Sequence, residues 1–313
     1  MARALAARVT PVTIELSTHV GDVQLRSPIM TAAGTSGYGD ELAGYGDLSQ
    51  LGAVVTKSLA SFAWEGNPAP RVVASGTHML NAVGLAGPGV EAWRRDHLPG
   101  LLARGAHVVG SIWGRNVGEF AAAANAMRGA QIVALEINAS CPNLEDRSNI
   151  FAHSATATAE IVSASHDAGV PLWVKLSPNT PDLVNIAGAA LEAGASALVL
   201  VNTVLGLAID IESRAAALGN GGGGLSGPGI LPVALRAVYD CRAAFATTPI
   251  VGVGGISSGE DAVAMLMAGA NACEVGTATF ANPRAPWIIQ KGLGEWMHRH
   301  QVSLNDIVGA AHG

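Results

Sequence analysis

The sequence predicts an α/β fold, a (β/α)8 or TIM barrel, and three observations support this class. Apolar runs of strand length recur eight times, and alanine-rich stretches with helical patterns lie between them. The runs are apolar throughout rather than alternating, as in parallel strands that are covered on both faces. The length of 313 residues suits one such barrel, so we expect a single domain spanning residues 1–313.

Each expected strand contains Val, Ile or Thr within a short apolar run. The strands are expected at residues 28–34, 53–59, 107–113, 132–140, 171–177, 197–203, 249–256 and 272–278. The clearest helical stretches are residues 154–168, 181–193, 230–245 and 258–268, and several begin near Ser, Thr, Asp or Pro, as helices do.

Three further segments lie outside this strand and helix alternation. Residues 12–26 hold two short alternating runs around Gly21 and Asp22, which predicts an N-terminal β-hairpin that could plug one end of the barrel. Long insertions at residues 60–90 and 204–229 follow the second and sixth strands, at the face where barrel enzymes build active sites. The glycine run at 219–224 is either a flexible linker or a loop that approaches a ligand closely.

The composition excludes several classes of protein. Hydrophobic residues make up 49% and charged residues only 13%, which indicates apolar surface hidden in an oligomer, and we expect a homodimer. The net charge of −6 and the absence of a Lys/Arg cluster argue against nucleic acid. The apolar stretch 186–201 is interrupted by Glu192 and is too short for a membrane span, and the amino terminus is a poor signal peptide.

The number and spacing of the cysteines also indicate the cellular compartment. Cys141, Cys241 and Cys273 are too few and too widely spaced for a disulfide framework or a metal site. We therefore expect no metal and a reducing, cytoplasmic environment.

One expected strand ends in unusual chemistry. Residues 132–143 read IVALEINASCPN, so the thiol of Cys141 lies between Asn138 and Asn143 and precedes Pro142. The proline disfavours a helical backbone at Cys141 and holds the thiol on a rigid turn. A reactive group at the carboxyl end of a barrel strand indicates catalysis, whereas a small buried hydrophobe is the commonest fate of a free cysteine. This segment alone leaves both interpretations open.

Polar residues are concentrated at the other strand ends. Lys57 and Lys175 sit within apolar strands, where an unpaired ammonium would be costly, and a resident anion would explain both. The pairs Gly254-Gly255 and Gly276-Thr277 follow the seventh and eighth strands, where barrels bind phosphate through backbone N–H groups. Glycine also permits tight turns, but its placement on both strands favours a cofactor that carries phosphate.

Ten motifs in order cover nearly the whole chain. They are TAAGTSGYG at 31–39, VTKS at 55–58, GNPAPRV at 66–72, MLNAVGL at 79–85, NASCPN at 138–143, VKLSPN at 174–179, VNT at 201–203, GGLSGP at 223–228, VGGISSGEDA at 253–262 and EVGTATFANP at 274–283. Together they resemble the dihydroorotate dehydrogenases, flavoenzymes of pyrimidine synthesis. The cysteine of NASCPN is similar to the cytosolic class 1 enzymes, and LNAVGLAGPG at 80–89 resembles the two-subunit, NAD-linked class 1B catalytic subunit.

The resemblance implies oxidation of (S)-dihydroorotate to orotate in de novo pyrimidine biosynthesis. Cys141 would remove the proton from carbon 5 while a hydride passes from carbon 6 to N5 of FMN. One alternative is a related dihydropyrimidine oxidoreductase. Another is a non-catalytic FMN-binding barrel, against which the presence of a base argues. Cys241 and Cys273 match no motif and are expected to be structural.

The resemblance also assigns binding residues. FMN would be surrounded by Ala33, Gly34, Lys57, Ser58, Asn138, Lys175, Val201, Gly227, Gly254, Gly255, Gly276 and Thr277. Lys175 would lie by the pyrimidine edge of the ring, where a cation stabilises the negative charge of the reduced state. Substrate would contact Lys57, Asn81, Ala82, Val83, Gly84, Leu85, Asn138, Asn143, Asn202 and Thr203. Carboxamides suit this task because each offers a donor and an acceptor.

A partner protein is expected for the onward transfer of electrons. The chain lacks a dinucleotide GxGxxG between a first strand and helix, and three cysteines cannot supply the four ligands of an iron–sulfur cluster. We therefore expect an iron–sulfur flavoprotein subunit that carries FAD and a 2Fe-2S cluster and passes electrons to NAD. The chain departs from the family pattern at Trp64-Glu65, at Ala33 and at residues 144–149. These differences remove no chemical group that the reaction needs, so they affect the expected shape of the site and of the partner surface rather than the reaction.

Overall fold

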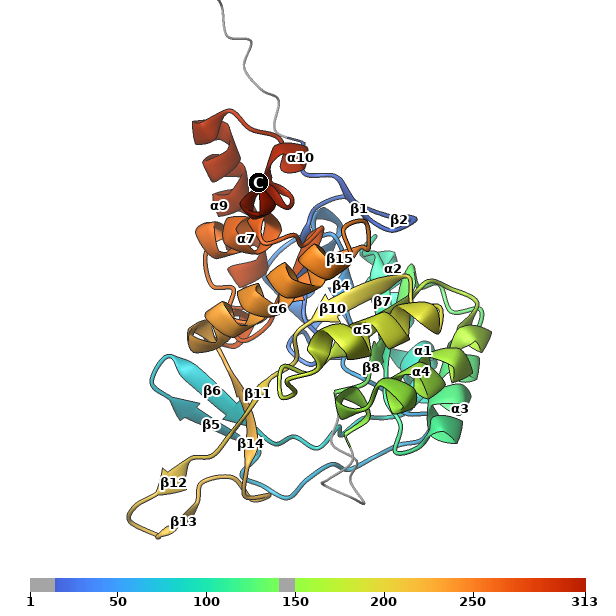
Figure 1. The fold of residues 1–313 in the computed structure, drawn as a ribbon. Coiled ribbons are helices and arrows are strands. Elements are labelled where there is room, and N and C mark those ends of the chain that lie inside the picture. The colour runs from blue at the N-terminus through green and yellow to red at the C-terminus, as the bar shows by residue number, and fades with distance from the viewer. Residues whose placement is uncertain (1–14, 141–149) are drawn as a thin grey trace, which may run out of the picture.

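The computed structural model describes residues 15–140 and 150–313, and eight parallel strands form its centre (Figure 1). In sheet order they are β3 (Ile29–Thr31), β16 (Ala272–Val275), β15 (Ile250–Val253), β10 (Ala197–Leu200), β9 (Leu172–Leu176), β8 (Ala134–Asn138), β7 (Val108–Ile112) and β4 (Val54–Val55). The two outermost strands meet, because Thr31 N donates to Ala53 O at 3.2 Å and Gly52 N donates to Ile29 O at 2.8 Å. The sheet therefore closes, which confirms the predicted (β/α)8 barrel.

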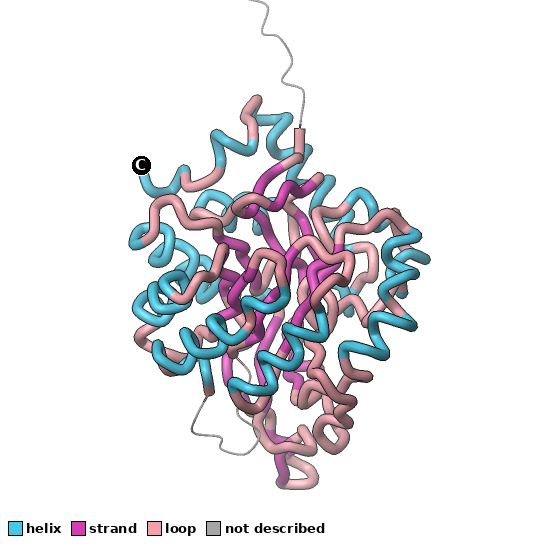
Figure 2. The backbone as a smooth tube through the Cα atoms, turned by 90° about the vertical axis from the view of Figure 1, so that its right-hand side faces the viewer, coloured by secondary structure: helices cyan, strands magenta, loops and turns pink. Residues whose placement is uncertain are grey.

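Helices surround the strands (Figure 2). The described helices are α1 (Val90–Asp96), α2 (Leu98–Ala103), α3 (Val117–Met127), α4 (Ala155–Ala164), α5 (Leu183–Glu192), α6 (Leu231–Ala244), α7 (Gly259–Met267), α8 (Ala278–Ala281), α9 (Ala285–His300) and α10 (Leu304–Ile307). The four helices expected from the sequence are confirmed as α4 to α7, and Ser154 and Ser258 cap two of them with their side chains. Among the described helices, none is both long and apolar enough to cross a membrane.

The amino-terminal half of the barrel is filled by side chains. Alternate strand residues point inward, and Met30, Val55, Val109 and Trp173 belong to one buried apolar cluster there. The strands β1 (Thr18–Val20) and β2 (Val23–Leu25) pair around Gly21 and Asp22 as predicted, and their buried valines and leucine join the same cluster. The hairpin thus plugs the amino end and leaves the carboxyl end for the site.

The two insertions meet at the opposite end and pair with each other (Figure 1). The first supplies β5 (Val72–Ser75) and β6 (His78–Asn81), and the second supplies β11 (Val204–Gly206) and β14 (Gly223–Ser226). They form an antiparallel sheet in the order β11-β14-β6-β5, which we call the insertion sheet. The sequence analysis expected long insertions but not this pairing.

The glycine run of the second insertion ends in β14. A Cβ atom at Gly223 would lie 2.5 Å from Asn81 O, and one at Gly224 would lie 2.1 Å from Thr203 Oγ1. A side chain at either position would collide with a residue that the sequence analysis assigned to substrate. The flexible-linker interpretation is therefore wrong for this part of the run, where close packing requires glycine.

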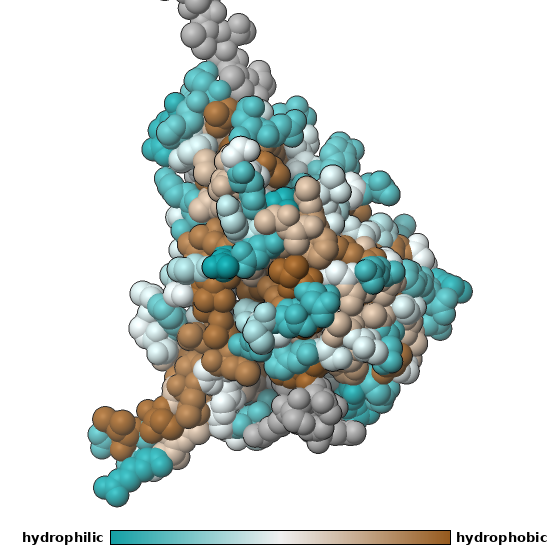
Figure 3. All heavy atoms as spheres, viewed as in Figure 1, coloured by the Kyte–Doolittle hydropathy of each residue, from teal (hydrophilic) through white to brown (hydrophobic). Residues whose placement is uncertain are grey.

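A small arm, residues 207–216, extends from the insertion sheet and carries β12 (Ile209–Asp210) and β13 (Ala215–Ala216). Its large side chains are exposed, with Leu207 at 58%, Ile209 at 57% and Ile211 at 78% of full accessibility. Figure 3 shows apolar residues gathered along this arm. Part of the apolar surface that the low charged fraction predicts is therefore located here.

Candidate active site

A cavity of about 1250 Å³ lies between the carboxyl ends of the barrel strands and the insertion sheet. This exceeds the ~300–1,000 Å³ usual for one small-molecule site, so the cavity has room for a cofactor and a substrate together. Its lining includes every described residue that the resemblance assigned to FMN or substrate: Ala33, Gly34, Lys57, Ser58, Asn81, Ala82, Val83, Gly84, Leu85, Asn138, Lys175, Val201, Asn202, Thr203, Gly227, Gly254, Gly255, Gly276 and Thr277. Cys141 and Asn143 lie outside the described residues.

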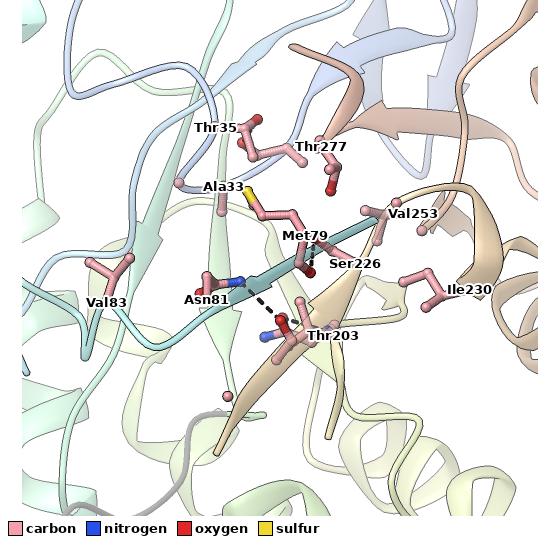
Figure 4. Close-up of a pocket in the computed structure, with 18 of the residues that line it drawn as sticks. Ala33, Thr35, Met79, Asn81, Val83, Thr203, Ser226, Ile230, Val253 and Thr277 are labelled. Atoms are coloured by element: carbon pink, nitrogen blue, oxygen red, sulfur yellow. Dashed lines mark hydrogen bonds between the residues drawn. The ribbon is translucent and has the colours of Figure 1, made fainter. Parts of the chain in front are cut away.

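Side chains from distant parts of the chain face this space (Figure 4). Asn81 comes from β6 of the insertion sheet and Thr203 follows barrel strand β10, while Ala33 and Thr277 follow strands β3 and β16. The fold thus brings together segments that the sequence analysis could group only by resemblance.

One wall of the cavity is bare backbone. Gly254 and Gly255 have φ values of +126° and +78°, a region that favours glycine. At Gly276 an added Cβ would meet only ordinary contacts, at 3.4 Å from Ala32 and 3.7 Å from Thr35. Packing does not demand glycine at this third position, but a side chain there would occupy cavity space. These residues therefore fit the phosphate-bearing end of a cofactor, which backbone N–H groups can approach closely.

At the wall of the cavity, Lys175 is buried beside two carboxyl groups. Its Nζ donates to Glu274 Oε2 at 2.8 Å and lies 3.6 Å from Glu136 Oε2. The lysine side chain is 6% exposed and both glutamates are fully buried. A resident anion was one explanation for this lysine, but the chain itself supplies two carboxyl groups beside Lys175, so the burial of its charge does not require one.

The surrounding charges shift the pKa of Lys175 and of Glu274. Burial alone would lower the pKa of Lys175, but Glu136 and Glu274 outweigh it and hold the pKa above its ordinary value. Burial raises the pKa of Glu274 to about 8, and the neighbouring Glu136 adds to the rise while Lys175 opposes it. At neutral pH the lysine is therefore charged and the Glu274 carboxyl holds a proton.

A chain of hydrogen bonds connects the carboxyl group of Glu136 to the carboxamides assigned to the substrate. Ser111 Oγ donates to Glu136 Oε1 at 3.1 Å, and it contacts Ser58 Oγ at 2.9 Å. Asn138 Nδ2 donates to Ser58 Oγ at 3.1 Å, and Asn202 Nδ2 donates to Asn138 Oδ1 at 3.3 Å. The two carboxamides are thus oriented by the protein itself, as a preorganised binding site requires.

The loop Asn81 to Leu85 is held by residues that the sequence analysis did not assign to the site. Trp64 Nε1 donates to Gly84 O at 3.0 Å, and Asn67 Nδ2 donates to Ala82 O at 3.1 Å. The Arg115 guanidinium lies over the Trp64 ring, 5.4 Å from its centre, and pairs with Glu119 at 2.6 Å. Trp64, a departure from the family pattern, therefore supports the proposed substrate loop.

Three residues that were not assigned from the sequence contact residues that were. Glu136 and Glu274 are charged residues at inward positions of apolar strands, the same signal that singled out Lys175. Asn179 follows β9, and its Nδ2 donates to Thr203 O at 3.0 Å. It stands in the VKLSPN motif, but only the structure shows that it fixes the backbone at Thr203.

The other two cysteines lie away from this cavity. Cys241 is buried in α6 and Cys273 is buried in β16. Burial raises the pKa of the Cys241 thiol to about 12 and that of Cys273 further, so neither is poised to form a thiolate.

Residues 15–297 match the sequence profile of a family described as dihydroorotate dehydrogenase. The chain is 43% identical over 296 residues to the dihydroorotate dehydrogenase B (NAD(+)) catalytic subunit of Alkaliphilus oremlandii, which covers 94% of this chain and 98% of that protein. It is 41% identical over 299 residues to the protein of the same name from Geotalea daltonii, covering 95% and 98% of the two chains. The protein of that name from Pelobacter propionicus is 42% identical over 299 residues, with the same coverage.

Proposed function

Because the chain belongs to the dihydroorotate dehydrogenase family, and within it to the NAD-linked class 1B catalytic subunits, we propose that it oxidises (S)-dihydroorotate with FMN in de novo pyrimidine biosynthesis. The observation that carries this proposal is the single cavity in which a glycine wall, a buried lysine and a set of oriented carboxamides meet. We also propose that residues 1–313 form one FMN-binding domain.

The cavity residues divide into two groups by chemistry. Gly254, Gly255 and Gly276 would hold the phosphate of FMN, and Lys175 would lie by the pyrimidine edge of its ring. When bound, FMN supplies an acceptor for two electrons. The remaining FMN contacts assigned by resemblance all line the same cavity, which supports their proposed role.

Substrate would be held by the carboxamide side of the cavity. Asn138 and Asn202 each offer donors and acceptors to the imide and urea groups of dihydroorotate, with Asn143 as a further contact. Thr203 and the loop Asn81 to Leu85 would enclose it from the insertion sheet, and Lys57 would face its carboxylate. The support for this orientation is that Asn138 and Asn202 are already hydrogen-bonded to the protein in defined directions.

Cys141 is the proposed base. Its thiolate would take the proton from carbon 5 as the hydride leaves carbon 6, so that dihydroorotate loses two electrons and two hydrogens in all. The preceding residue, Ser140, lines the cavity and donates to Asn138 Oδ1 at 3.0 Å, which supports this assignment.

We expect the purified chain to be yellow and to bleach when dihydroorotate is added without oxygen. Denaturation should then release one FMN per chain, identified by mass. The control is the same amount of dihydrouracil, which lacks the carboxylate and should leave the flavin yellow. Bleaching by dihydrouracil alone would point instead to a related dihydropyrimidine oxidoreductase, and a chain that takes up no FMN would contradict the proposal.

The relatives are named as catalytic subunits of an NAD(+)-linked enzyme, which implies a separate electron-transfer subunit for this chain too. We propose that this partner is an iron–sulfur flavoprotein with FAD and a 2Fe-2S cluster, and that two catalytic chains form a homodimer. The exposed apolar side chains of the arm support an interface of some kind on this chain.

The partner proposal predicts a change of electron acceptor. Alone, the chain should oxidise dihydroorotate with an artificial dye and show little activity with NAD. Co-expression with the partner encoded by the same organism should add NAD activity while the dye activity stays within about twofold. Efficient turnover of the isolated chain with fumarate or NAD would contradict this prediction.

A further inference from the structure

Three ionisable side chains occupy one layer of the barrel interior, and one of them, Lys175, lines the cavity. Glu136 comes from β8, Lys175 from β9 and Glu274 from β16, so the group spans the barrel. The neighbours of Glu274 on its own sheet are β3 and β15, whose residues carry no charge. Lys175 and Glu136 are therefore the charged groups that face it.

This layer holds one carboxyl group more than the lysine needs. A single carboxylate would neutralise Lys175, and burying a second is unfavourable unless it is paired or protonated. Among the described residues, Glu136 Oε2 and Glu274 Oε1 have no hydrogen-bond partner, although both atoms are buried. The packing of the barrel does not require this second carboxyl group. A role toward the cavity that Lys175 lines explains it better.

We propose that Glu136 and Glu274 are positioning residues which hold Lys175 toward the flavin and thereby set the reduction potential of the flavin. The proposal rests on the FMN site proposed above. The hydride that leaves dihydroorotate carries one negative charge to the flavin, and the proton from carbon 5 goes to Cys141. A protonated Glu274 leaves Lys175 free to balance that charge, whereas a second carboxylate would oppose it.

The charge of the layer explains what each variant should do. With Glu274 protonated, the layer holds one ammonium and one carboxylate. Either Glu274→Gln or Glu136→Gln also leaves one carboxylate for Lys175, so each single variant should keep this balance at every pH. The double variant removes both carboxylates, so the negative charge of the reduced flavin becomes the counter-charge for the Lys175 ammonium, and the reduced flavin should be favoured.

The test is a redox titration of the FMN-loaded protein between about pH 6 and about pH 10, a range that brackets the pKa of Glu274, about 8. In the natural protein the potential should fall more steeply with pH above this pKa, because ionised Glu274 then opposes reduction. In each single variant, the reduction potential should not fall more steeply with pH above about 8. The double variant should raise the equilibrium constant for reduction at least about tenfold, which is about 30 mV for a two-electron couple.

The exposed Glu192→Gln variant, which removes one charge far from the barrel interior, is the matched control and should behave as the natural protein. FMN content measured for every sample separates the two proposals. Normal FMN content with identical potential curves in all variants would overturn this inference alone. A chain without FMN would overturn both the proposed function and this inference. If the double variant does not fold, the two single variants still decide the result through their pH profiles.

Discussion

Replacing Cys141 with alanine is expected to slow flavin reduction by dihydroorotate at least about a hundredfold, the usual scale for loss of a general base. FMN should remain bound, because Lys175 and the three glycines proposed to hold its phosphate lie on other strands and loops. The measurement is anaerobic stopped-flow absorbance of the bound flavin. The serine variant should act as a poorer base, and its rate should improve as the pH rises.

Cys241→Ala is the matched control, because this thiol is buried in α6 outside the cavity lining. It should reduce its flavin at the rate of the natural protein. If Cys141→Ala were to reduce its flavin as fast as this control between about pH 6 and about pH 9, around the usual thiol pKa, the assignment of the base would be wrong.

The second large effect is expected at Lys175, where methionine should lower the free energy of unfolding by about 3–5 kcal/mol near pH 8. Methionine is similar in size but leaves Glu136 and Glu274 together without their cation. Urea unfolding of FMN-free protein gives the comparison without any contribution from bound cofactor.

The pH dependence of this loss has a defined sign. The pKa of Glu274 is raised in the folded protein from an ordinary value of 4.5 to about 8, so stability from its protonation is present at low pH and falls as the pH rises through about 8. Without Lys175 the pKa rises further, because the lysine opposes the shift. The loss caused by Lys175→Met should therefore be small near pH 4.5 and largest above pH 8.

Lys291→Met is the control for this experiment. Lys291 also pairs with a glutamate, Glu295, but its side chain is 78% exposed. Exposed pairs contribute at most about 1 kcal/mol, so its variant should unfold nearly as the natural protein does. Equal losses at Lys175 and Lys291, or a loss at Lys175 that does not depend on pH, would contradict the buried cluster as described.

The barrel was predictable because its signals are local. Each strand is a short apolar run such as residues 197–203, and the structure confirms a strand, β10, within it. The hairpin was equally clear from Gly21 and Asp22 between alternating runs. Pairing of the two insertions was not predictable, because β6 and β14 are distant in sequence and the register depends on glycine packing that no local pattern records.

The sequence predicted which residues line the site, but not which of them contact one another. The residues assigned by resemblance line one cavity wherever the structure describes them, yet their roles toward FMN and substrate remain proposals. For Lys175, the sequence analysis saw the buried cation and inferred an anion from outside. It overlooked Glu136 and Glu274, because a partner across a barrel cannot be recognised from sequence spacing alone.

The division of the cavity between barrel and insertions has a consequence for inhibitor design. The wall formed by Gly254, Gly255 and Gly276 presents mainly backbone atoms, whose chemistry does not depend on the residue type, so contacts there discriminate little between enzymes. The insertion sheet presents side chains such as Met79 and Leu205, which belong to segments that differ most readily between proteins. A selective competitor of this enzyme should therefore be built outward from the substrate end, toward the insertion sheet.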